Sequence, residues 1–246
     1  MRELSLLALL VSSVLACGGG GGTAENAETT ATATAAASNQ ATTATATAAA
    51  GPEVPSTCEQ KGTLCLPPAE FVKRLCNNVN PDIALAYFRK GTPFTRAYLR
   101  GDTAAWNASG GASSEDKLVF DEEVIVLLER RNNTGIEVSG ASSNFDVLRW
   151  NGSCASLSAE EISFTTPPKP KNAHIEWKYL SDETQNALLS DAGLAKANKD
   201  RRDECKGASM GTVSKKCVTL VDKQSDAIAA FIRNGGEVPL PTKVKP

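Results

Sequence analysis

The chain has 246 residues, with 26 basic and 28 acidic side chains, a formal net charge of −2 and an aromatic content of 5%. A balance this close to neutral, with both signs interspersed, argues against a nucleic-acid groove or a polybasic membrane patch. No phosphate-binding loop, nucleophile elbow, zincin motif or dinucleotide-binding fingerprint occurs, which excludes the enzyme classes that carry these motifs.

The chain opens with a short apolar run, Leu4 to Ala16, that ends at Cys17. A membrane-spanning helix needs roughly 20 apolar residues, so this shorter run favours the hydrophobic region of a secretory signal. Val14 to Cys17, VLAC, resembles the lipobox of bacterial lipoproteins. The resemblance implies cleavage between Ala16 and Cys17 and acylation of Cys17 by chains such as palmitate. An ordinary secretory signal cut near Ala16 is the alternative.

The expected localisation follows from the same resemblance. Two or three acyl chains hold a protein stably on a bilayer. Gly18 follows the cysteine, and by resemblance to enterobacterial sorting a residue other than Asp at this place permits export to the outer membrane. We therefore expect a lipid-anchored protein of the cell envelope, in the outer membrane and on its periplasmic or surface-exposed side.

Residues 17–57 predict a disordered tether. Gly18 to Gly22 are consecutive glycines, and Thr23 to Ala50 consists mainly of Ala and Thr, with no aromatic residue and no aliphatic residue larger than Ala. Such a segment cannot bury enough apolar surface to offset the entropy of ordering its chain. A tether of about 40 residues has a root-mean-square reach on the order of 35 Å.

Seven cysteines are an odd number for an exported protein, and lipidation of Cys17 leaves an even set of six. An even count in an oxidising compartment predicts disulfides, here three. Cys205 and Cys217 flank a short Gly-containing connection, which favours their pairing. The other four are expected to pair among themselves: Cys58, Cys65, Cys76 and Cys154. Wide spacings and a single histidine, His174, disfavour a zinc site or a catalytic thiol, so no metal or cofactor is expected.

Two short helices are predicted at the start of the folded part. The segment 69–76, AEFVKRLC, places apolar side chains one turn apart. Asn80-Pro81-Asp82 is a helix-start pattern, with a capping Asn, Pro at the first helical position and an acid in the first turn. It predicts a second helix over 82–90, stopped by Gly91.

The hydrophobic period then changes to that of antiparallel strands. Strand character is found over 97–99, 117–130, 136–138 and 144–150, with a bend at Asp121-Glu122-Glu123 and turns at 132–135 and Asn151-Gly152. Strands of this length with tight turns predict a small antiparallel barrel or curled sheet.

The helical period returns after the prolines at 167, 168 and 170. Ser181-Asp182-Glu183 begins a predicted helix that ends near Arg201-Arg202, and a last helix is predicted from Val218 to Arg233, ended by Asn234-Gly235-Gly236. The two form a C-terminal helical hairpin. The predicted class is therefore α+β with three disulfides, organised as a signal peptide over 1–16, a lipidated tether over 17–57 and one domain over 58–246.

Two further resemblances concern this domain. The segments TRAYLRG, LVFDEEVIVLLERR and FDVLRWNGSC loosely resemble the SH3-like barrels of exported bacterial proteins, domains that often bind cell-wall peptides. Across most of its length the domain is similar to uncharacterised envelope lipoproteins of myxobacteria, which share AEFVKRLC, TRAYLRG, FDEEV and VLRW-x-G-SC. That similarity implies no activity.

Three sets of side chains are candidates for a site. Asp121-Glu122-Glu123 could be a calcium ligand set or a carboxylate pair, although a charged strand edge or turn is the favoured interpretation. His174, beside Trp177 and Tyr179, could belong to a pocket, and a partly buried structural histidine is favoured. The tryptophans at 106, 150 and 177 could line a ligand cleft, and core packing is favoured.

The sequence supports two classes of function. The first is a non-enzymatic, membrane-anchored envelope lipoprotein whose domain binds an envelope protein or peptidoglycan, or has a structural role, with no nucleic-acid partner. The alternative is a cell-wall hydrolase of unrecognised type that uses acidic residues. No recognisable catalytic triad occurs, so no catalytic residue is assigned.

Overall fold

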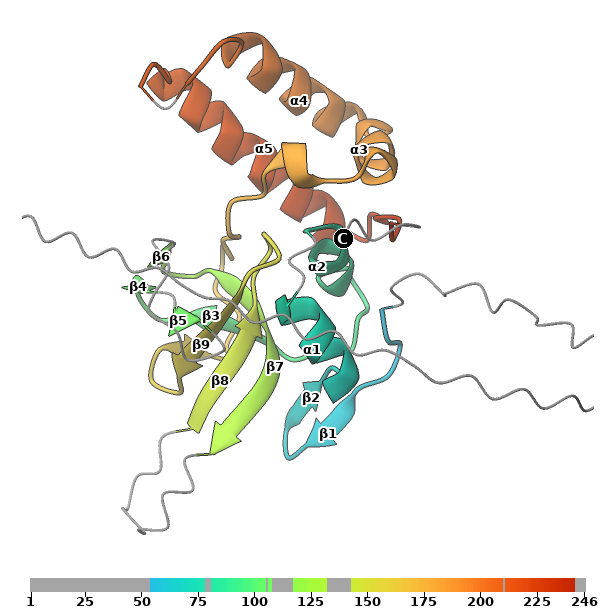
Figure 1. The fold of residues 1–246 in the computed structure, drawn as a ribbon, viewed down its shortest axis with the longest axis vertical. Helices are drawn as coiled ribbons and strands as arrows, with labels where there is room; N and C mark the ends of the chain where they lie inside the picture. The colour runs from blue at the N-terminus through green and yellow to red at the C-terminus, as the bar shows by residue number, and fades with distance from the viewer. Residues whose placement is uncertain are drawn as a thin grey trace, which may run out of the picture. The chain divides into compact units, whose positions relative to one another are not determined.

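The fold combines an antiparallel sheet with helices from both ends of the described chain (Figure 1). The computed structural model describes residues 54–77, 81–104, 106–107, 117–131, 143–209 and 211–241. The predicted signal peptide, Cys17 and most of the predicted tether lie outside these ranges. The capping Asn80, the predicted turn at 132–135, the predicted strand at 136–138 and the side chain of Trp106 lie outside them as well.

The main sheet is antiparallel and has the strand order β10-β3-β7-β8-β9-β5. Its strands are β3 (Arg96–Leu99), β5 (Trp106–Asn107), β7 (Glu123–Arg131), β8 (Ser143–Leu148), β9 (Cys154–Ser158) and β10 (Ile162–Ser163). Among the described residues β10 and β5 do not pair with each other, so the sheet is open and the barrel alternative is wrong. A register shift in β7 between Val126 and Leu128 marks a bulge, which bends a strand and increases its twist.

Two strand pairs lie outside this sheet, and of their four strands the sequence predicted only the one at Lys117–Leu118, which falls within the predicted strand segment 117–130. β1 (Glu59–Lys61) pairs with β2 (Leu64–Leu66), and β4 (Thr103–Ala104) pairs with β6 (Lys117–Leu118). β1 is polar and exposed along its whole length, so it carries no alternating pattern. The turn between β1 and β2 contains Gly62 at φ +63°, a conformation that glycine adopts without steric cost.

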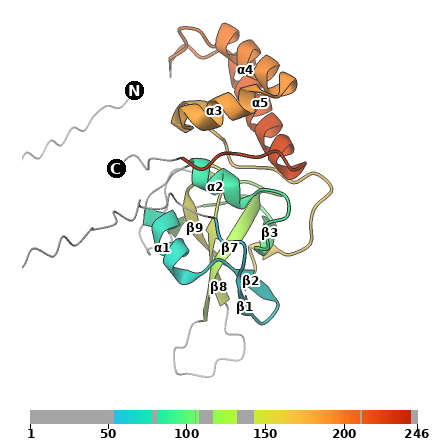
Figure 2. The same cartoon turned by 90° about the vertical axis from the view of Figure 1, so that its right-hand side faces the viewer.

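The helices are α1 (Ala69–Asn77), α2 (Pro81–Tyr87), α3 (Asp182–Leu189), α4 (Ala192–Glu204) and α5 (Lys215–Arg233), with a short 3₁₀ turn, η1, at Trp177–Tyr179. The single helix predicted from Ser181 to Arg202 is wrong, because Asp191 caps a new helix by accepting the Leu194 N–H at 2.9 Å. α2 also ends earlier than predicted. α4 and α5 run side by side as the predicted hairpin (Figures 1 and 2).

Side-chain alternation along β7 divides the core into two clusters. Val124 and Val126 belong to an inner cluster with residues of β3, β8 and β9, and β2 contributes Leu64 and Leu66. Ile125 and Leu127 belong to a second cluster that residues of all five helices complete. Neighbouring residues of a strand face opposite sides of the sheet, so β7 supplies both clusters.

Three disulfides join the predicted cysteines. They are Cys58–Cys65, Cys76–Cys154 and Cys205–Cys217. The preferred Cys205–Cys217 pairing is confirmed, as is the expectation that the other four cysteines pair among themselves. Cys76–Cys154 ties α1 to β9, whereas Cys205–Cys217 closes the end of the α4–α5 hairpin.

Candidate functional site

The acidic triplet lies where the chain turns from β6 into β7, and its three members have different surroundings. Asp121 adopts a φ of +63°, the left-handed region that non-glycine residues rarely occupy. Its backbone is held on both sides: Asp121 N–H donates to the Leu99 carbonyl at 3.0 Å, and Lys171 N–H donates to the Asp121 carbonyl at 2.8 Å. These bonds fix the Asp121 side chain at the surface of the turn.

Glu122 forms a fully buried ion pair with Arg149. Arg149 Nε donates to Glu122 Oε1 at 2.7 Å and Nη2 donates to Oε2 at 3.2 Å, while the Val119 N–H donates to Oε2 at 3.1 Å. The Glu122 side chain is 0% exposed. Both carboxylate oxygens therefore have donors, and no substrate can approach them from solvent.

Glu123 is buried between two arginines. Arg96 from β3 donates to Oε1 at 2.7 Å, and Arg233 from the last turn of α5 donates to Oε2 at 2.7 Å. The Arg233 guanidinium also lies 4.8 Å from the ring centroid of Trp150, in cation–π geometry. This carboxylate joins the sheet to the C-terminal helix.

The favoured interpretation of the triplet as a charged, solvent-facing turn is therefore wrong for Glu122 and Glu123. Arg96 and Arg149 lie 27 residues from the glutamates that they contact, and Arg233 lies 110 residues from Glu123. The local sequence therefore contains no sign of these partners. Among the described residues, no group of three or more His, Cys, Asp or Glu side chains is placed to hold a metal ion.

His174 also differs from its favoured interpretation. Its side chain is 44% exposed, and Nδ1 lies 4.0 Å from an Asp222 carboxylate oxygen. Trp177 beside it is buried in the core, and Tyr179 is 60% exposed, so the three side chains do not form a common pocket. Exposure follows from alternation, since Ala173 and Ile175 on either side of His174 face the core.

Core packing of tryptophan is confirmed for the two whose side chains are described. Trp150 is fully buried and stacks on Phe88 with ring centroids 4.1 Å apart. Trp177 belongs to the same cluster. They do not line a ligand cleft.

Asp82 is a buried carboxylate that connects two helices. It accepts the Ser181 N–H, at 3.0 Å to Oδ2, at the residue that caps α3. Burial raises the pKa of Asp82 above its ordinary value of 3.8, and hydrogen bonds from Thr184 and Ser181 act in the opposite direction. The position links α2 to the helical hairpin and offers no open face to a substrate.

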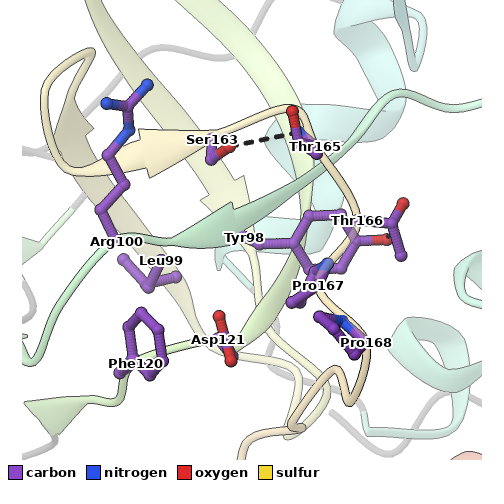
Figure 3. Close-up of a pocket in the computed structure, with 10 residues that line it drawn as sticks. All are labelled: Tyr98, Leu99, Arg100, Phe120, Asp121, Ser163, Thr165, Thr166, Pro167 and Pro168. Carbon is purple, nitrogen blue, oxygen red and sulfur yellow. Dashed lines mark hydrogen bonds between the residues drawn. The ribbon is translucent and has the colours of Figure 1, made fainter.

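A surface hollow of about 470 Å³ lies over one edge of the sheet (Figure 3). It is lined by Tyr98 to Arg100 at the end of β3, by Phe120 and Asp121 from the turn, by Ser163 of β10, and by Thr165 to Pro168 after β10. Tyr98 Oη is tied to this last segment, because it accepts the Thr166 hydroxyl at 3.3 Å.

The sequence did not predict this hollow. Its lining comes from three segments that meet only through the β10–β3–β7 register, and none of these segments indicates a hollow when its sequence is viewed alone. The exposed Phe120, 50% accessible beside a left-handed aspartate, is the most unusual feature of the lining. An aromatic residue directly before the acids of a predicted bend is the sequence signal that could have pointed to it.

The chain was compared with known proteins. No protein-family model, no curated protein and no solved structure matches it. Within the part of the chain that the structure describes, no helix has both the length and the apolar character needed to cross a membrane.

Proposed function

We propose that this protein is a lipid-anchored lipoprotein of the bacterial cell envelope whose disulfide-bonded α+β domain is a non-catalytic binding or structural module. In this proposal residues 1–16 are the signal peptide, Cys17 carries the acyl chains and residues 17–57 form the tether. The outer membrane is the proposed location, and an envelope protein or peptidoglycan is the proposed partner.

The observation that carries the proposal is the pairing of cysteines. Six of the seven cysteines are joined in disulfides, so Cys17 alone is left over. Structural disulfides persist in oxidising compartments outside the cytosol, which supports export. A cysteine that no intramolecular disulfide requires, at the end of an apolar leader, is suited to lipidation.

The surroundings of the acidic residues favour binding over hydrolysis. A glycosidase needs two carboxyl groups that reach the scissile bond, and Glu122 and Glu123 are buried and engaged by arginines. A cell-wall hydrolase that uses this pair is therefore the weaker alternative. The hollow beside Asp121 is better suited to holding a ligand than to cleaving one.

The anchor is tested with Cys17→Ser, which removes the thiol that accepts the lipid. We expect the variant to leave the membrane fraction and lose the mass of the acyl chains, because one hydrophobic anchor is lost at about 0.8 kcal/mol per buried methylene. Ser12→Ala, a change within the same apolar run, is the matched control and should remain membrane-bound. Membrane fractionation and mass spectrometry of the N-terminal peptide are the measurements.

Thiol titration of the denatured, unreduced chain separates the two kinds of signal. Lipidation predicts no free thiol in the wild-type protein. An ordinary secretory signal that leaves Cys17 in the mature chain predicts one. Finding that thiol, together with Cys17→Ser in the membrane fraction, would contradict the anchor.

A further inference from the structure

We propose that the hollow binds an organic ammonium ion, such as the side-chain amine of a lysine or another diamino acid in a peptide, with Asp121 as its counter-ion. This inference rests on the proposed role of the domain as a binding module, and it assigns the ligand class. Three features of the hollow carry it: an unused carboxylate, apolar and aromatic walls, and a cation already resting on one of those walls.

The carboxylate of Asp121 is available to a ligand. The backbone of Asp121 is held by Leu99 and Lys171, yet its side-chain oxygens have no hydrogen-bond or ion-pair partner among the described residues. The two neighbouring acids, by contrast, are saturated by arginine. Rare backbone conformations held by surrounding structure occur often at ligand sites, and this one fixes a carboxylate at the mouth of a hollow.

The walls beside this carboxylate are suited to an alkylammonium. In Figure 3 the Asp121 side chain is seen between the ring of Phe120 and Pro168, and Tyr98 lies above it in this view, beside Thr166. Aromatic faces attract cations through their quadrupole, and proline rings and aromatic rings together cover an aliphatic stem. A ligand with an aliphatic chain and a terminal charge satisfies both kinds of surface.

A cation of this protein already uses one of the aromatic walls. Lys171 Nζ lies 5.9 Å from the centroid of the Phe120 ring, within cation–π range. The ring therefore accepts an ammonium in this environment, and no ion pair joins Lys171 to Asp121 in the described structure.

Two charged residues line the hollow, Asp121 and Arg100. Arg100 is the cationic residue of the lining, and its Nε donates to the Ile162 carbonyl at 2.6 Å. Figure 3 shows its guanidinium pointing away from Asp121. Asp121 is the acidic residue of the lining, and Thr165 and Thr166 add hydroxyl groups to it.

The experiment titrates the full mature chain in detergent with Nα-acetyl-lysine amide and with Nα-acetyl-norleucine amide, which has a similar stem without the charge. We expect the lysine amide to bind and to shift NMR signals of Tyr98, Phe120 and Asp121, and the norleucine amide to bind at least about tenfold more weakly, as for loss of one charge-assisted contact. Lysine peptides and cell-wall stem peptides with a free diamino-acid amine then identify the source of the amine.

Asp121→Asn tests the counter-ion without disturbing the turn, because Asn tolerates the left-handed region as well as Asp. We expect the same circular dichroism and thermal midpoint as the wild type and at least about tenfold weaker lysine-amide binding. Asp182→Asn, the same change at an exposed position in α3, should bind like the wild type. Phe120→Leu keeps an apolar side chain but removes the aromatic ring, so it should bind the lysine amide more weakly than the wild type.

Equal binding of the two amides, or undiminished binding by Asp121→Asn, would overturn the inference. If the wild type and Asp121→Asn capture the same envelope component equally, the ammonium assignment is overturned and the binding-module proposal stands. If the lysine amide binds in an Asp121-dependent manner but the wild type captures no envelope component, the assignment holds and the proposed function fails.

Discussion

At the scale of single residues, the two neighbouring glutamates show how strand geometry sets their surroundings. Side chains alternate between the two faces of a strand, so Glu122 points to the same face as Val124, and Glu123 points to the same face as Ile125. The two glutamate side chains therefore point to opposite faces. One meets Arg149 beside the inner cluster and the other meets Arg233 of α5. Identical side chains one position apart thus stabilise different contacts.

The Glu122–Arg149 pair gives the first stability prediction. Glu122→Gln should lower the free energy of unfolding by about 3–5 kcal/mol, because it leaves the Arg149 charge buried without its carboxylate. Glu160→Gln, at an exposed position, is the control and should change stability by less than about 0.5 kcal/mol. Urea unfolding at neutral pH is the measurement.

A double variant tests whether the loss in Glu122→Gln comes from the unpaired Arg149 charge. Replacing both partners by Met removes the two charges together, and it should recover part of the loss seen in Glu122→Gln. Wild-type stability in Glu122→Gln would show that the ion pair is dispensable. A hydrolytic activity lost in a stable Glu122→Gln variant would instead revive the enzyme alternative.

Asp82 gives a pH-dependent prediction. Because burial raises its folded pKa above 3.8, the protonated form is favoured by folding, and the stability that Asp82 contributes declines as pH rises from 3.8 through the raised pKa. The wild type should therefore lose stability relative to Asp82→Asn over that interval and stay level above it. Chemical unfolding of both proteins, from below the ordinary value to neutral pH, measures the difference.

The matched control for this series is Asp182→Asn, an exposed carboxylate in the first turn of α3. Its side chain is exposed, so this variant reports the effect of an Asp-to-Asn change without burial. A constant difference for Asp82→Asn, or one that changes in the opposite direction, would show that burial is not the dominant influence on this carboxylate.

At the scale of elements, the disulfides differ in what they constrain. Cys205–Cys217 has a sequence separation of 12 and Cys76–Cys154 one of 78. In the chain-entropy account, loops of these lengths correspond to about 3 and about 4.5 kcal/mol. The first closes one hairpin, and the second joins a helix to the sheet.

We therefore expect the paired serine variants to behave differently. Cys205→Ser with Cys217→Ser should expose the end of the hairpin to limited proteolysis while the sheet keeps its hydrogen-exchange protection. Cys76→Ser with Cys154→Ser should lower the global unfolding midpoint by a larger amount. Equal effects on the whole domain would mean that the hairpin unfolds together with the sheet rather than locally.

Much of the element order could be predicted from sequence, and the exceptions have physical reasons. The helices α1 and α5 and the β8–β9 hairpin have strong periodicity and clear end signals, such as Gly152 at φ +84°. The break at Asp191 was missed because the apolar pattern continues across it. β1 and β10 were missed because short edge strands contain too few residues to show alternation.

The site was less accessible to prediction than the fold. The hollow depends on β3, the turn at Asp121 and the segment after β10 meeting in space, and the burial of Glu122 and Glu123 depends on distant arginines. Hydrophobic periodicity describes each segment alone and does not predict tertiary contacts between segments that are distant in the sequence. The cysteine pattern is the exception. An even number of cysteines after Cys17 and the short spacing between Cys205 and Cys217 were sufficient to predict that these two form a disulfide.

At the scale of the whole molecule, β7 lies between two apolar clusters. The cluster that contains Ile125 and Leu127 also includes residues of α5, the last helix. Ile228, Ala229 and Ile232 of α5 pack in the same cluster as Trp150, and Arg233 meets Glu123 at 2.7 Å. The C-terminal helix is therefore part of the domain core, and not an appendage to it.

This arrangement constrains the order in which a newly made chain can mature. The ribosome synthesises the chain from its amino end, so Glu123 is made long before Arg233. The Glu123 carboxylate can therefore gain its second arginine partner only after α5 has been synthesised. Premature stop codons inside α5 should thus be as harmful as damage to Trp150.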